Sequence, residues 1–277
     1  MSLPDFIYRR PKTLAEALAI LADDADARAL AGGQTLLPAL KQRLARPSQL
    51  VDLQDIPDLR GVTVGADAVT IGAMTPHHVT ATDPAVGRAI PALAHLAGGI
   101  AHPQVRHRGT MGGSIANNDP AADYPAALVG LGATVQTTRR RIAADDFFTG
   151  LFLTALEPGE LVLSIRFPRP RRAGYHKFPS LASGYVTTGA FVSEGPAGIR
   201  VAVNGAGPCV FRQADAEARL TRDFTPAALT GFAQPTEGLN SDLHAHARYR
   251  AQLVAVAIAR ALDMALAQPV PEPETLP

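Results

Sequence analysis

Residues 27–53 read ARALAGGQTLLPALKQRLARPSQLVDL, and this stretch decides the fold of the N-terminal part of the chain. The short apolar run at 27–31 is typical of a strand, residues 36–45 are typical of a helix, and 49–53 are typical of a second strand. Two strands joined through a helix are typical of a parallel sheet, because a parallel pair needs a long crossover connection.

The residues before this stretch extend the same pattern. Residues 5–8 are typical of a short strand, and Thr13 with Glu16 forms a capping box that predicts the start of a helix. The apolar residues that follow recur at helical spacing: Leu14, Ala17, Leu18 and Leu21. We therefore expect a small parallel βαβαβ subdomain over residues 1–54.

The pattern changes after this subdomain. Residues 61–72 alternate apolar with small or polar residues around a turn, which predicts a hairpin and the start of an antiparallel sheet. Further elements are expected in this part, with helices at 76–82, 84–98 and 121–131 and strands at 133–137 and 161–167. We place an antiparallel-sheet subdomain at 55–172, which completes a first domain over 1–172 that ends at the Pro/Arg-rich stretch 168–173.

A smaller α+β domain is expected over residues 173–267. Its predicted elements are strands at 175–178, 186–192 and 199–203 and helices at 212–220, 226–231 and 248–267. Residues 268–277 are Pro-rich, and we expect a disordered tail there. The fold class is therefore α/β followed by α+β.

Composition excludes several classes of protein. Of the 277 residues, 47% are hydrophobic and 18% are charged, which excludes a disordered chain. The formal net charge of +1, from 26 basic and 25 acidic residues, argues against a broad surface for nucleic acid.

Cys209 is the single cysteine, so the chain has no internal disulfide, no Cys-based zinc site and no iron–sulfur cluster of its own. The first residues lack the pattern of a signal peptide, and no apolar run is long enough to span a bilayer. We expect a cytoplasmic protein without a membrane span.

The segment from Ala31 to Pro38, AGGQTLLP, lies between a predicted strand and a predicted helix. Gly32 and Gly33 carry no Cβ, so backbone N–H groups could approach a ligand closely, and a helix N-terminus favours a phosphate. The alternative is a tight turn without a ligand. The segment matches neither the dinucleotide fingerprint nor the P-loop.

The segment from Gly109 to Asp123, GTMGGSIANNDPAAD, is a second glycine-rich and polar loop in this interpretation. It contains few residues that could form a core, so either a polar ligand binds along its backbone or its own Asn and Asp turns hold it together. Two such loops favour the ligand, because each could hold one side of a dinucleotide diphosphate.

No competing chemistry stands out in the sequence. The pairs His77–His78 and His244–His246 lack a third ligand at metal spacing and are expected to be surface or cap histidines. The run Arg139–Arg141 is expected to be a solvated turn or to meet an acidic partner. We predict no catalytic and no metal-binding side chain, so any reactive atoms would belong to a cofactor.

Several motifs together resemble the FAD-binding medium subunits of molybdenum hydroxylases, the family that includes the medium chain of aerobic carbon monoxide dehydrogenase and the flavin domain of xanthine dehydrogenase. They cover almost the whole chain and keep the family's order: AGGQTLLP (31–38), QVRHRGTMGGS (104–114), DPAAD (119–123), FFTG (147–150), GEL (159–161), YHKF (175–178) and Tyr249-Arg250.

The resemblance implies an FAD-binding fold of the vanillyl-alcohol-oxidase type and a set of cofactor-binding residues. The first loop would wrap the diphosphate, the second would cover the diphosphate and ribityl chain, Asp123 would bind the adenosine side, Ile100 would lie near the adenine–ribityl region, and Tyr185 would cover the flavin ring. Leu161 and Val162 would contact the adenine, and Lys177 would lie close to the FAD. The full set implied is Leu30, Ala31, Gly32, Gly33, Gln34, Thr35, Leu36, Leu37, Ile100, Thr110, Met111, Gly112, Gly113, Ser114, Asn118, Asp123, Leu161, Val162, Lys177 and Tyr185.

The resemblance also implies partners. A large chain would hold a molybdopterin centre, a small chain would hold two [2Fe-2S] clusters, and the complex would be a dimer of heterotrimers that passes electrons through FAD to an external acceptor. Residues 177–186 read KFPSLASGYV and lack the arginines and the Asp that the family usually has there, which alters the charge around the flavin. Two alternatives stay open: a scaffolding subunit that has lost flavin, and a stand-alone flavin reductase.

Overall fold

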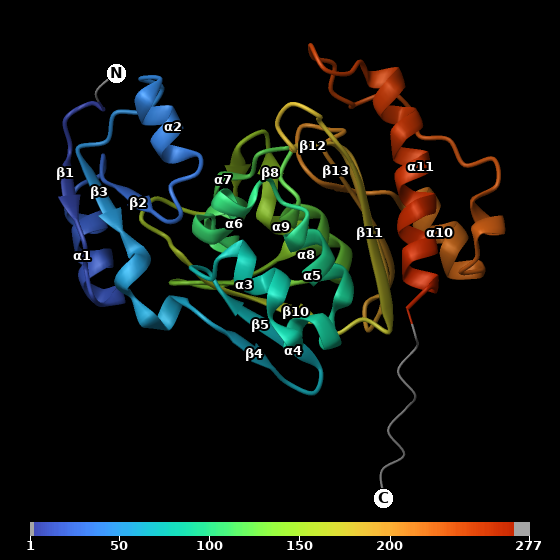
Figure 1. The fold of residues 1–277 in the computed structure, drawn as a ribbon, viewed down its shortest axis with the longest axis horizontal. Helices are drawn as coiled ribbons and strands as arrows, with labels where there is room; N and C mark the ends of the chain where they lie inside the picture. Colours follow the sequence, from blue (N-terminus) through green and yellow to red (C-terminus); the bar gives the residue numbers. More distant parts are fainter. Residues whose placement is uncertain (1–2, 269–277) are drawn as a thin grey trace, which may run out of the picture.

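The computed structural model of the chain describes residues 3–268. Figure 1 shows three parts along its long axis: an N-terminal unit, a central sheet with helices over it, and a C-terminal sheet with a long helix on its outer side. Residues 269–277, most of the expected disordered tail, lie outside the described residues.

The N-terminal unit is a three-stranded sheet with one helix on each face. Its elements are β1 (Ile7–Arg9), α1 (Leu14–Asp23), β2 (Arg28–Leu30), α2 (Leu36–Lys41) and β3 (Gln49–Asp52), followed by the 3-10 turns η1 (Leu53–Asp55) and η2 (Pro57–Leu59). Strand β3 lies between β1 and β2 and pairs with both in parallel, which confirms the expected parallel sheet. Successive side chains of β3 point to opposite faces, so Leu50 packs on the α2 side and Val51 on the α1 side.

The central sheet is antiparallel and five-stranded. In spatial order its strands are β4 (Val62–Val64), β5 (Ala68–Gly72), β10 (Val162–Pro168), β6 (Thr134–Thr137) and β7 (Arg141–Ala143). Strands β4 and β5 form the expected hairpin, and Ile165 of β10 pairs with Ile71 of β5. The elements β8 (Phe148–Gly150) and β9 (Leu153–Thr154) form a separate two-stranded ribbon.

Short helices cover the central sheet. They are α3 (His77–Thr82), α4 (Pro84–Ala89), α5 (Pro91–Gly98), α6 (Pro103–Arg108), α7 (Met111–Asn117), α8 (Tyr124–Leu131) and α9 (Ala144–Phe147). The single helix expected at 84–98 is divided at Ile90, because Pro91 cannot donate the backbone hydrogen bond that a continuous helix needs. Helix α8 is buried along its whole length, between the central sheet and the C-terminal sheet.

The C-terminal sheet has the order β11 (Arg172–Pro179), β12 (Val186–Gly195), β13 (Gly198–Asn204) and β14 (Phe211–Arg212). Its helices are α10 (Ala214–Arg222) and α11 (Ala247–Leu266), with the 3-10 turn η3 (Pro226–Leu229) between them. Strand alternation divides its side chains: Phe191 and Ala202 join the core under α8, while Val192 and Val201 face α11 on the other side.

The mixed α/β architecture is therefore as expected from the sequence. The core under α8 runs on from the central part into the first strand of the C-terminal sheet, through Ala173 and Tyr175. The domain boundary at residue 172 stays a prediction, and so does the assignment to the vanillyl-alcohol-oxidase type.

Gly174 marks the closest packing of α11 on β11, and its substitution tests this contact. A Cβ at Gly174 would lie 2.0 Å from the Ala261 carbonyl oxygen, so Gly174→Ala has to displace the helix backbone. We expect the free energy of unfolding to fall by about 2 kcal/mol, measured by urea denaturation.

Gly87→Ala is the matched control for this prediction. Gly87 lies in α4, and a Cβ there would meet nothing within 4 Å. Since alanine favours a helix over glycine, this variant should keep or gain stability, by up to about 1 kcal/mol. Equal losses in both variants would contradict the proposed tight contact of α11.

Candidate functional site

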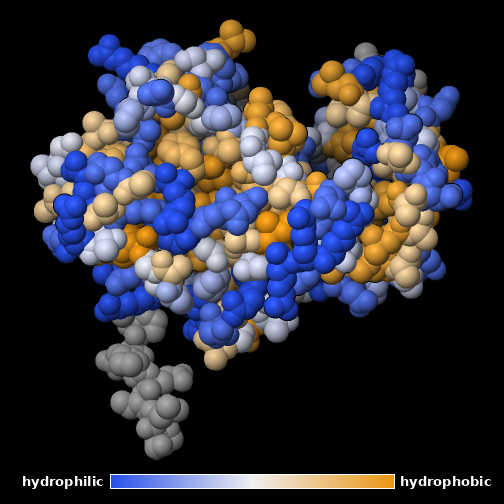
Figure 2. Space-filling model, turned by 180° about the vertical axis from the view of Figure 1, so that it is seen from behind, coloured by the Kyte–Doolittle hydropathy of each residue, from blue (hydrophilic) through white to orange (hydrophobic). Residues whose placement is uncertain are grey.

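A cavity of about 510 Å³ opens between the N-terminal unit and the central part. From behind, Figure 2 shows the surface hollowed between these two parts. The volume lies within the roughly 300–1,000 Å³ of typical small-molecule sites. The wall comes from the segment after β2, from α7 and the residues around it, from the segment before β10, and from Gly184 and Tyr185.

The first glycine-rich segment leads from β2 into α2 along the cavity. Gly33 has a left-handed φ of +71°, and a Cβ at Gly32 would lie 2.1 Å from the Arg108 carbonyl oxygen, so glycine is required at both positions. Within residues 3–268, the backbone N–H groups of Gly32 to Thr35 donate no hydrogen bond to the protein. These four donors are therefore free for an anionic ligand.

The second glycine-rich segment is not a loop, and this prediction was wrong. Residues 111–117 form helix α7, which Thr110 caps by accepting a hydrogen bond from Gly113 N at 3.2 Å. Close packing of the helix explains why glycine is present in this segment. A Cβ at Gly112 would lie 2.6 Å from the Ala73 Cβ.

The amides that begin α7 are already used inside the protein. Met111 N donates to the Thr75 carbonyl at 3.2 Å and Gly112 N to the Ala73 carbonyl at 2.8 Å. Polar contacts to a ligand from this segment would therefore come from the hydroxyls of Thr110 and Ser114, which both line the cavity.

A buried polar group joins the cavity to the C-terminal sheet. Asp123 lines the cavity, and its Oδ1 accepts a hydrogen bond from the Tyr175 hydroxyl at 2.9 Å and pairs with Lys177 Nζ at 2.8 Å. Burial raises the pKa of Asp123, a shift that the neighbouring Lys177 opposes. Lys177 Nζ also donates to the carbonyls of Gly99 and Gly184, at 2.9 and 3.3 Å, so one ammonium group holds three separate segments at the cavity.

His77 was expected to be a surface or cap histidine, and this prediction was wrong: it is the first residue of α3, but it is buried and no side-chain hydrogen bond caps that helix. Its side chain is buried at the cavity wall, and its ring lies 5.2 Å from the ring of Tyr124. Burial, together with the charge of Arg106, lowers its pKa from 6.5 to about 4, so His77 is neutral at pH 7. The sequence carried no sign of this, because the burial depends on the turn at Gly109 and on Tyr124 of α8 packing against the start of α3.

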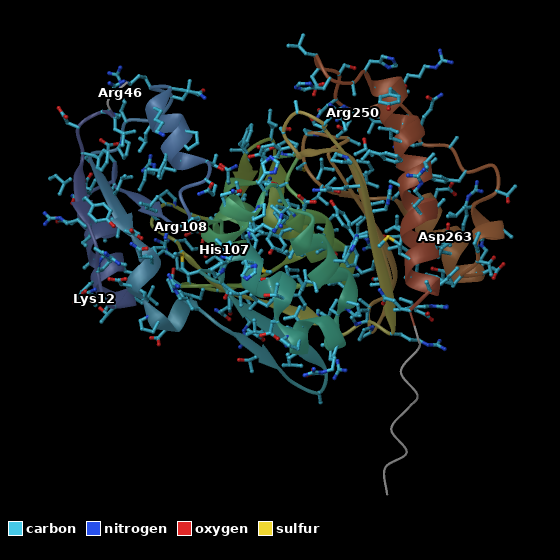
Figure 3. The ribbon with its side chains drawn as sticks, viewed as in Figure 1. Lys12, Arg46, His107, Arg108, Arg250 and Asp263 are labelled. Atoms are coloured by element: carbon cyan, nitrogen blue, oxygen red, sulfur yellow. The ribbon has the colours of Figure 1, made fainter. Side chains whose placement is uncertain are left out.

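The neighbouring histidine lies on the outside of the same wall. The ring of His78 rests on the ring of His107, with 4.0 Å between the centroids. His107 and Arg108, labelled in Figure 3, lie between the N-terminal unit and the central helices, where they line a smaller cavity of about 60 Å³.

Most of the site residues expected from the resemblance meet at the main cavity. Those that line it are Ala31, Gly32, Gly33, Gln34, Thr35, Leu36, Ile100, Thr110, Gly112, Gly113, Ser114, Asp123, Leu161, Val162 and Tyr185. Their contact with a cofactor stays a prediction.

Five expected residues lie behind the wall. Leu30, Leu37 and Met111 pack in the apolar interior, and Lys177 reaches the cavity through Asp123 and Gly184. Asn118 is buried, and its side-chain amide donates to the carbonyls of Gly150 and Leu153 at 2.8 and 2.7 Å.

Sequence reasoning missed part of the wall. The unpredicted lining residues include Arg28, Leu53, Met74, His77, Asn117, Asp119, Leu156 and Glu160. Three of them carried a signal: Glu160 is the acidic centre of the GEL motif, Asp119 opens the DPAAD motif, and Asn117 lies in the second glycine-rich segment. The others have no local pattern that marks them.

Metal and membrane sites are not found in the described part of the chain. Among residues 3–268, no cluster of three or more His, Cys, Asp or Glu side chains is placed to hold a metal ion. No helix within the same residues combines the length and apolar character needed to cross a membrane.

Comparisons with known proteins identify the chain's relatives. Residues 4–170 match the family described as the FAD-binding domain in molybdopterin dehydrogenase. The chain is 35% identical to the nicotine 6-hydroxylase medium subunit of Paenarthrobacter nicotinovorans, over 90% of this chain and 93% of that protein. It is 36% identical to the carbon monoxide dehydrogenase medium chain of Hydrogenophaga pseudoflava, over 86% and 91%.

A solved structure agrees with these sequence matches. The reconstituted CO dehydrogenase from Oligotropha carboxidovorans contains a chain that superimposes with a TM-score of 0.90 at 34% identity, covering 97% of this chain and all of that one.

The residues of the cavity fit FAD. The free amides of Gly32 to Thr35 suit a diphosphate, and Leu53, Leu156 and Leu161 offer an apolar wall for a ring. The missing Cβ of Gly113, which would lie 3.1 Å from the Ala31 Cβ, keeps the two glycine-rich segments close enough to face one ligand.

The buried neutral state of His77 predicts a pH dependence. Because the pKa falls from 6.5 to about 4 on folding, the unfolded chain binds an extra proton between these values, and stability is lost as the pH falls through this window. We expect His77 alone to lower the free energy of unfolding by about 3 kcal/mol between pH 7 and pH 4.

The measurement compares urea unfolding of the wild type and His77→Gln at pH 7 and pH 4. On going from pH 7 to pH 4, the wild type should lose about 3 kcal/mol more of its free energy of unfolding than the variant does. His244→Gln, at an exposed position, is the control and should follow the wild type. Parallel curves for His77→Gln and the wild type would show that His77 takes up its proton freely in the folded protein.

Proposed function

This chain belongs to the family of FAD-binding domains of molybdopterin dehydrogenases, and we propose that it carries electrons within a molybdenum hydroxylase complex. The electrons would enter from [2Fe-2S] clusters of a small partner chain and leave to an external acceptor. A large partner chain would hold the molybdopterin centre. The relatives' names support this, since they are medium chains or subunits and so imply larger and smaller partners.

The bound FAD would supply the redox chemistry. The chain's own residues bind, orient and shield it, in line with the absence of a predicted nucleophile–base pair among the wall residues. The amides of Gly32 to Thr35 would hold the diphosphate, with help from the Thr110 and Ser114 hydroxyls. Leu161 and Val162 would contact the adenine, and Asp123 would accept a hydrogen bond from the adenosine side.

Lys177 acts through its neighbours in this proposal. Its ammonium group holds the Asp123 carboxylate and the carbonyls of Gly99 and Gly184. Gly184 precedes Tyr185, which lines the cavity and is half exposed. Lys177 would therefore orient Asp123 and place Tyr185 over one face of the flavin ring, where it excludes water.

The single observation that carries the proposal is the row of four unused amides beside an apolar wall. Such a row of donors is open to a ligand, because the protein itself leaves it unpaired, and it matches the oxygens of a diphosphate. The altered stretch at 177–186 suggests a scaffold that has lost flavin, but the chain carries the glycines of both segments, which favours flavin binding.

The test of the function has two stages. The purified chain should take up FAD and show flavin absorbance, whereas a colourless chain that binds no added FAD would support the scaffold. The chain assembled with its large and small partners should then show reduction of the flavin by substrate. Flavin reduction by NADH in the isolated chain, without partners, would support the stand-alone reductase instead.

Gly32→Ala tests the first segment. The Cβ would lie 2.1 Å from the Arg108 carbonyl oxygen, so the segment has to move and its amides lose their common direction. We expect the Kd for FAD to rise at least about 100-fold, since nearly 3 kcal/mol of hydrogen bonding depends on the segment.

Gly65→Ala is the matched control for this variant. Gly65 lies in the turn between β4 and β5, and a Cβ there would lie 3.5 Å from the nearest heavy atom. FAD titration followed by quenching of flavin fluorescence should give an unchanged Kd. Wild-type affinity in Gly32→Ala would remove the first segment from the proposed site.

A further inference from the structure

Arg139 and Arg140, in the turn between β6 and β7, both contact the segment between β9 and β10 at the cavity. Arg139 Nη1 pairs with Glu157 at 2.6 Å, and Arg139 Nη2 donates to the Pro158 carbonyl at 2.9 Å. Arg140 Nη2 donates to the Ala155 carbonyl at 2.7 Å. These arginines therefore meet an acidic segment of their own chain, which answers the alternative that the sequence left open.

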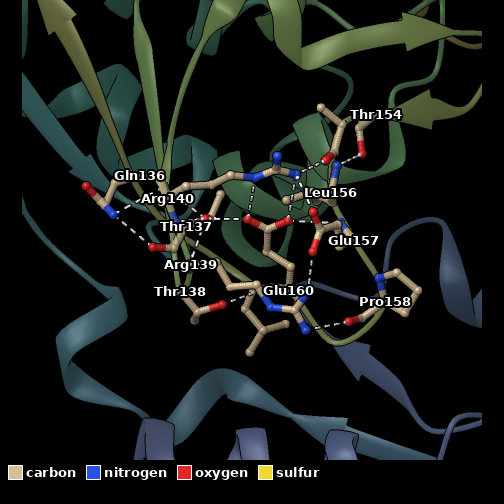
Figure 4. A network of polar contacts seen from close by, with 12 residues as sticks. Gln136, Thr137, Thr138, Arg139, Arg140, Thr154, Leu156, Glu157, Pro158 and Glu160 are labelled. Carbon is tan, nitrogen blue, oxygen red and sulfur yellow. Dashed lines mark hydrogen bonds and ion pairs between the residues drawn. The ribbon is translucent and has the colours of Figure 1, made fainter.

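Glu160 is the buried centre of this network (Figure 4). Its side chain is 0% exposed, and it accepts hydrogen bonds from Arg140 Nε at 3.3 Å, the Thr137 hydroxyl at 2.6 Å and Glu157 N at 2.9 Å. Burial alone would raise the pKa of Glu160, but these donors outweigh it and hold the pKa below its usual value. The carboxylate is therefore charged and held by donors from the β6–β7 turn and from its own segment.

The clamped segment is a wall of the cavity. Leu156, Glu160, Leu161 and Val162 all line it, and Thr138 supports the same segment because its hydroxyl accepts a hydrogen bond from Leu161 N at 3.2 Å. Leu156 precedes Glu157, and Leu161 follows Glu160, so both apolar side chains are fixed next to the ion pairs. The segment between β9 and β10 has no regular secondary structure of its own to hold it in place.

We propose that Arg140 and Glu160 are positioning residues for the cofactor's adenine half, because the ion pair between Arg140 and the buried carboxylate of Glu160 fixes the wall formed by Leu156, Leu161 and Val162. Neither residue is a catalytic group. The proposal rests on the proposed function, in which Leu161 and Val162 contact the adenine. Without the ion pair the segment that carries Leu156 and Leu161 becomes more mobile. Cofactor binding then has to order this segment, which weakens binding although no direct contact is removed.

The third arginine of the run supplies a matched control. Arg141 is exposed, and among residues 3–268 its side chain donates only to Gln136 Oε1, at 2.9 Å, on the neighbouring strand. The variants Arg140→Gln and Arg141→Gln remove the same charge from adjacent positions. Only the first of them touches the cavity wall.

The experiment measures FAD and ADP binding to the full chain at 25 °C. For Arg140→Gln we expect the Kd for FAD and the inhibition constant of ADP to rise together, by about tenfold. Arg141→Gln should stay within about twofold of the wild type in both. Arg140→Lys should recover part of the loss, because an ammonium group can pair with Glu160 but cannot hold Glu160 and the Ala155 carbonyl in a fixed fork.

A purely structural role predicts a different result. In that case Arg140→Gln lowers the melting temperature of the FAD-free chain while the FAD and ADP constants stay within twofold, and the inference is overturned. A rise in the FAD constant without a rise for ADP also overturns it, because the wall then contacts the other half of the cofactor. If Arg140→Gln does not fold, Arg140→Lys carries the test, with a rise of about threefold expected in both constants.

The outcome for the wild type separates this inference from the proposed function. A wild-type chain that binds no FAD would overturn the proposed function, and the inference with it. A wild-type chain that binds FAD, with Arg140 variants that bind it equally well, would overturn the inference alone.

Discussion

The backbone contact between Gly32 and the Arg108–Gly109 turn is the constraint on which the site depends. The position of the missing Gly32 Cβ lies 2.1 Å from the Arg108 carbonyl oxygen and 2.7 Å from the Gly109 Cα, so no other residue fits there. This contact brings the end of β2 against the start of α7, although 76 residues separate Gly32 from Arg108 in the sequence. The cavity exists because the N-terminal unit closes on the central part at this point.

The two glycine-rich segments have different tasks, although their compositions are similar. The first leaves four amides free and needs glycine for its backbone conformation and its close contact. The second uses its amides for the carbonyls of Thr75 and Ala73, and its glycines let α7 pack closely. The free backbone donors therefore lie on one side of the cavity, and the hydroxyls of Thr110 and Ser114 lie on the other.

Behind the wall, two ion pairs hold the segments that lack regular structure. Lys177 joins Asp123, Gly99 and Gly184 on the side of the C-terminal sheet, and Arg140 joins Glu160 and Ala155 on the side of the central sheet. In each ion pair the carboxylate, Asp123 or Glu160, is buried, and charge-assisted hydrogen bonds are strongest away from solvent. Rigid walls reduce the ordering that a ligand has to impose, which is how residues without contact to it can affect its affinity.

The sequence by itself determined the parallel N-terminal sheet, the β4–β5 hairpin, the mixed α/β class, the family, and about half of the residues of the cavity wall. These features depend on local signals: hydrophobic period, capping residues, glycine and proline positions, and long ordered motifs. Only the tertiary structure decided that Met111–Asn117 is a helix, that His77 is buried, and that Arg140 reaches Glu160. Each of these depends on which distant segment lies beside the residue, and neither local propensity nor spacing along one chain encodes that neighbour.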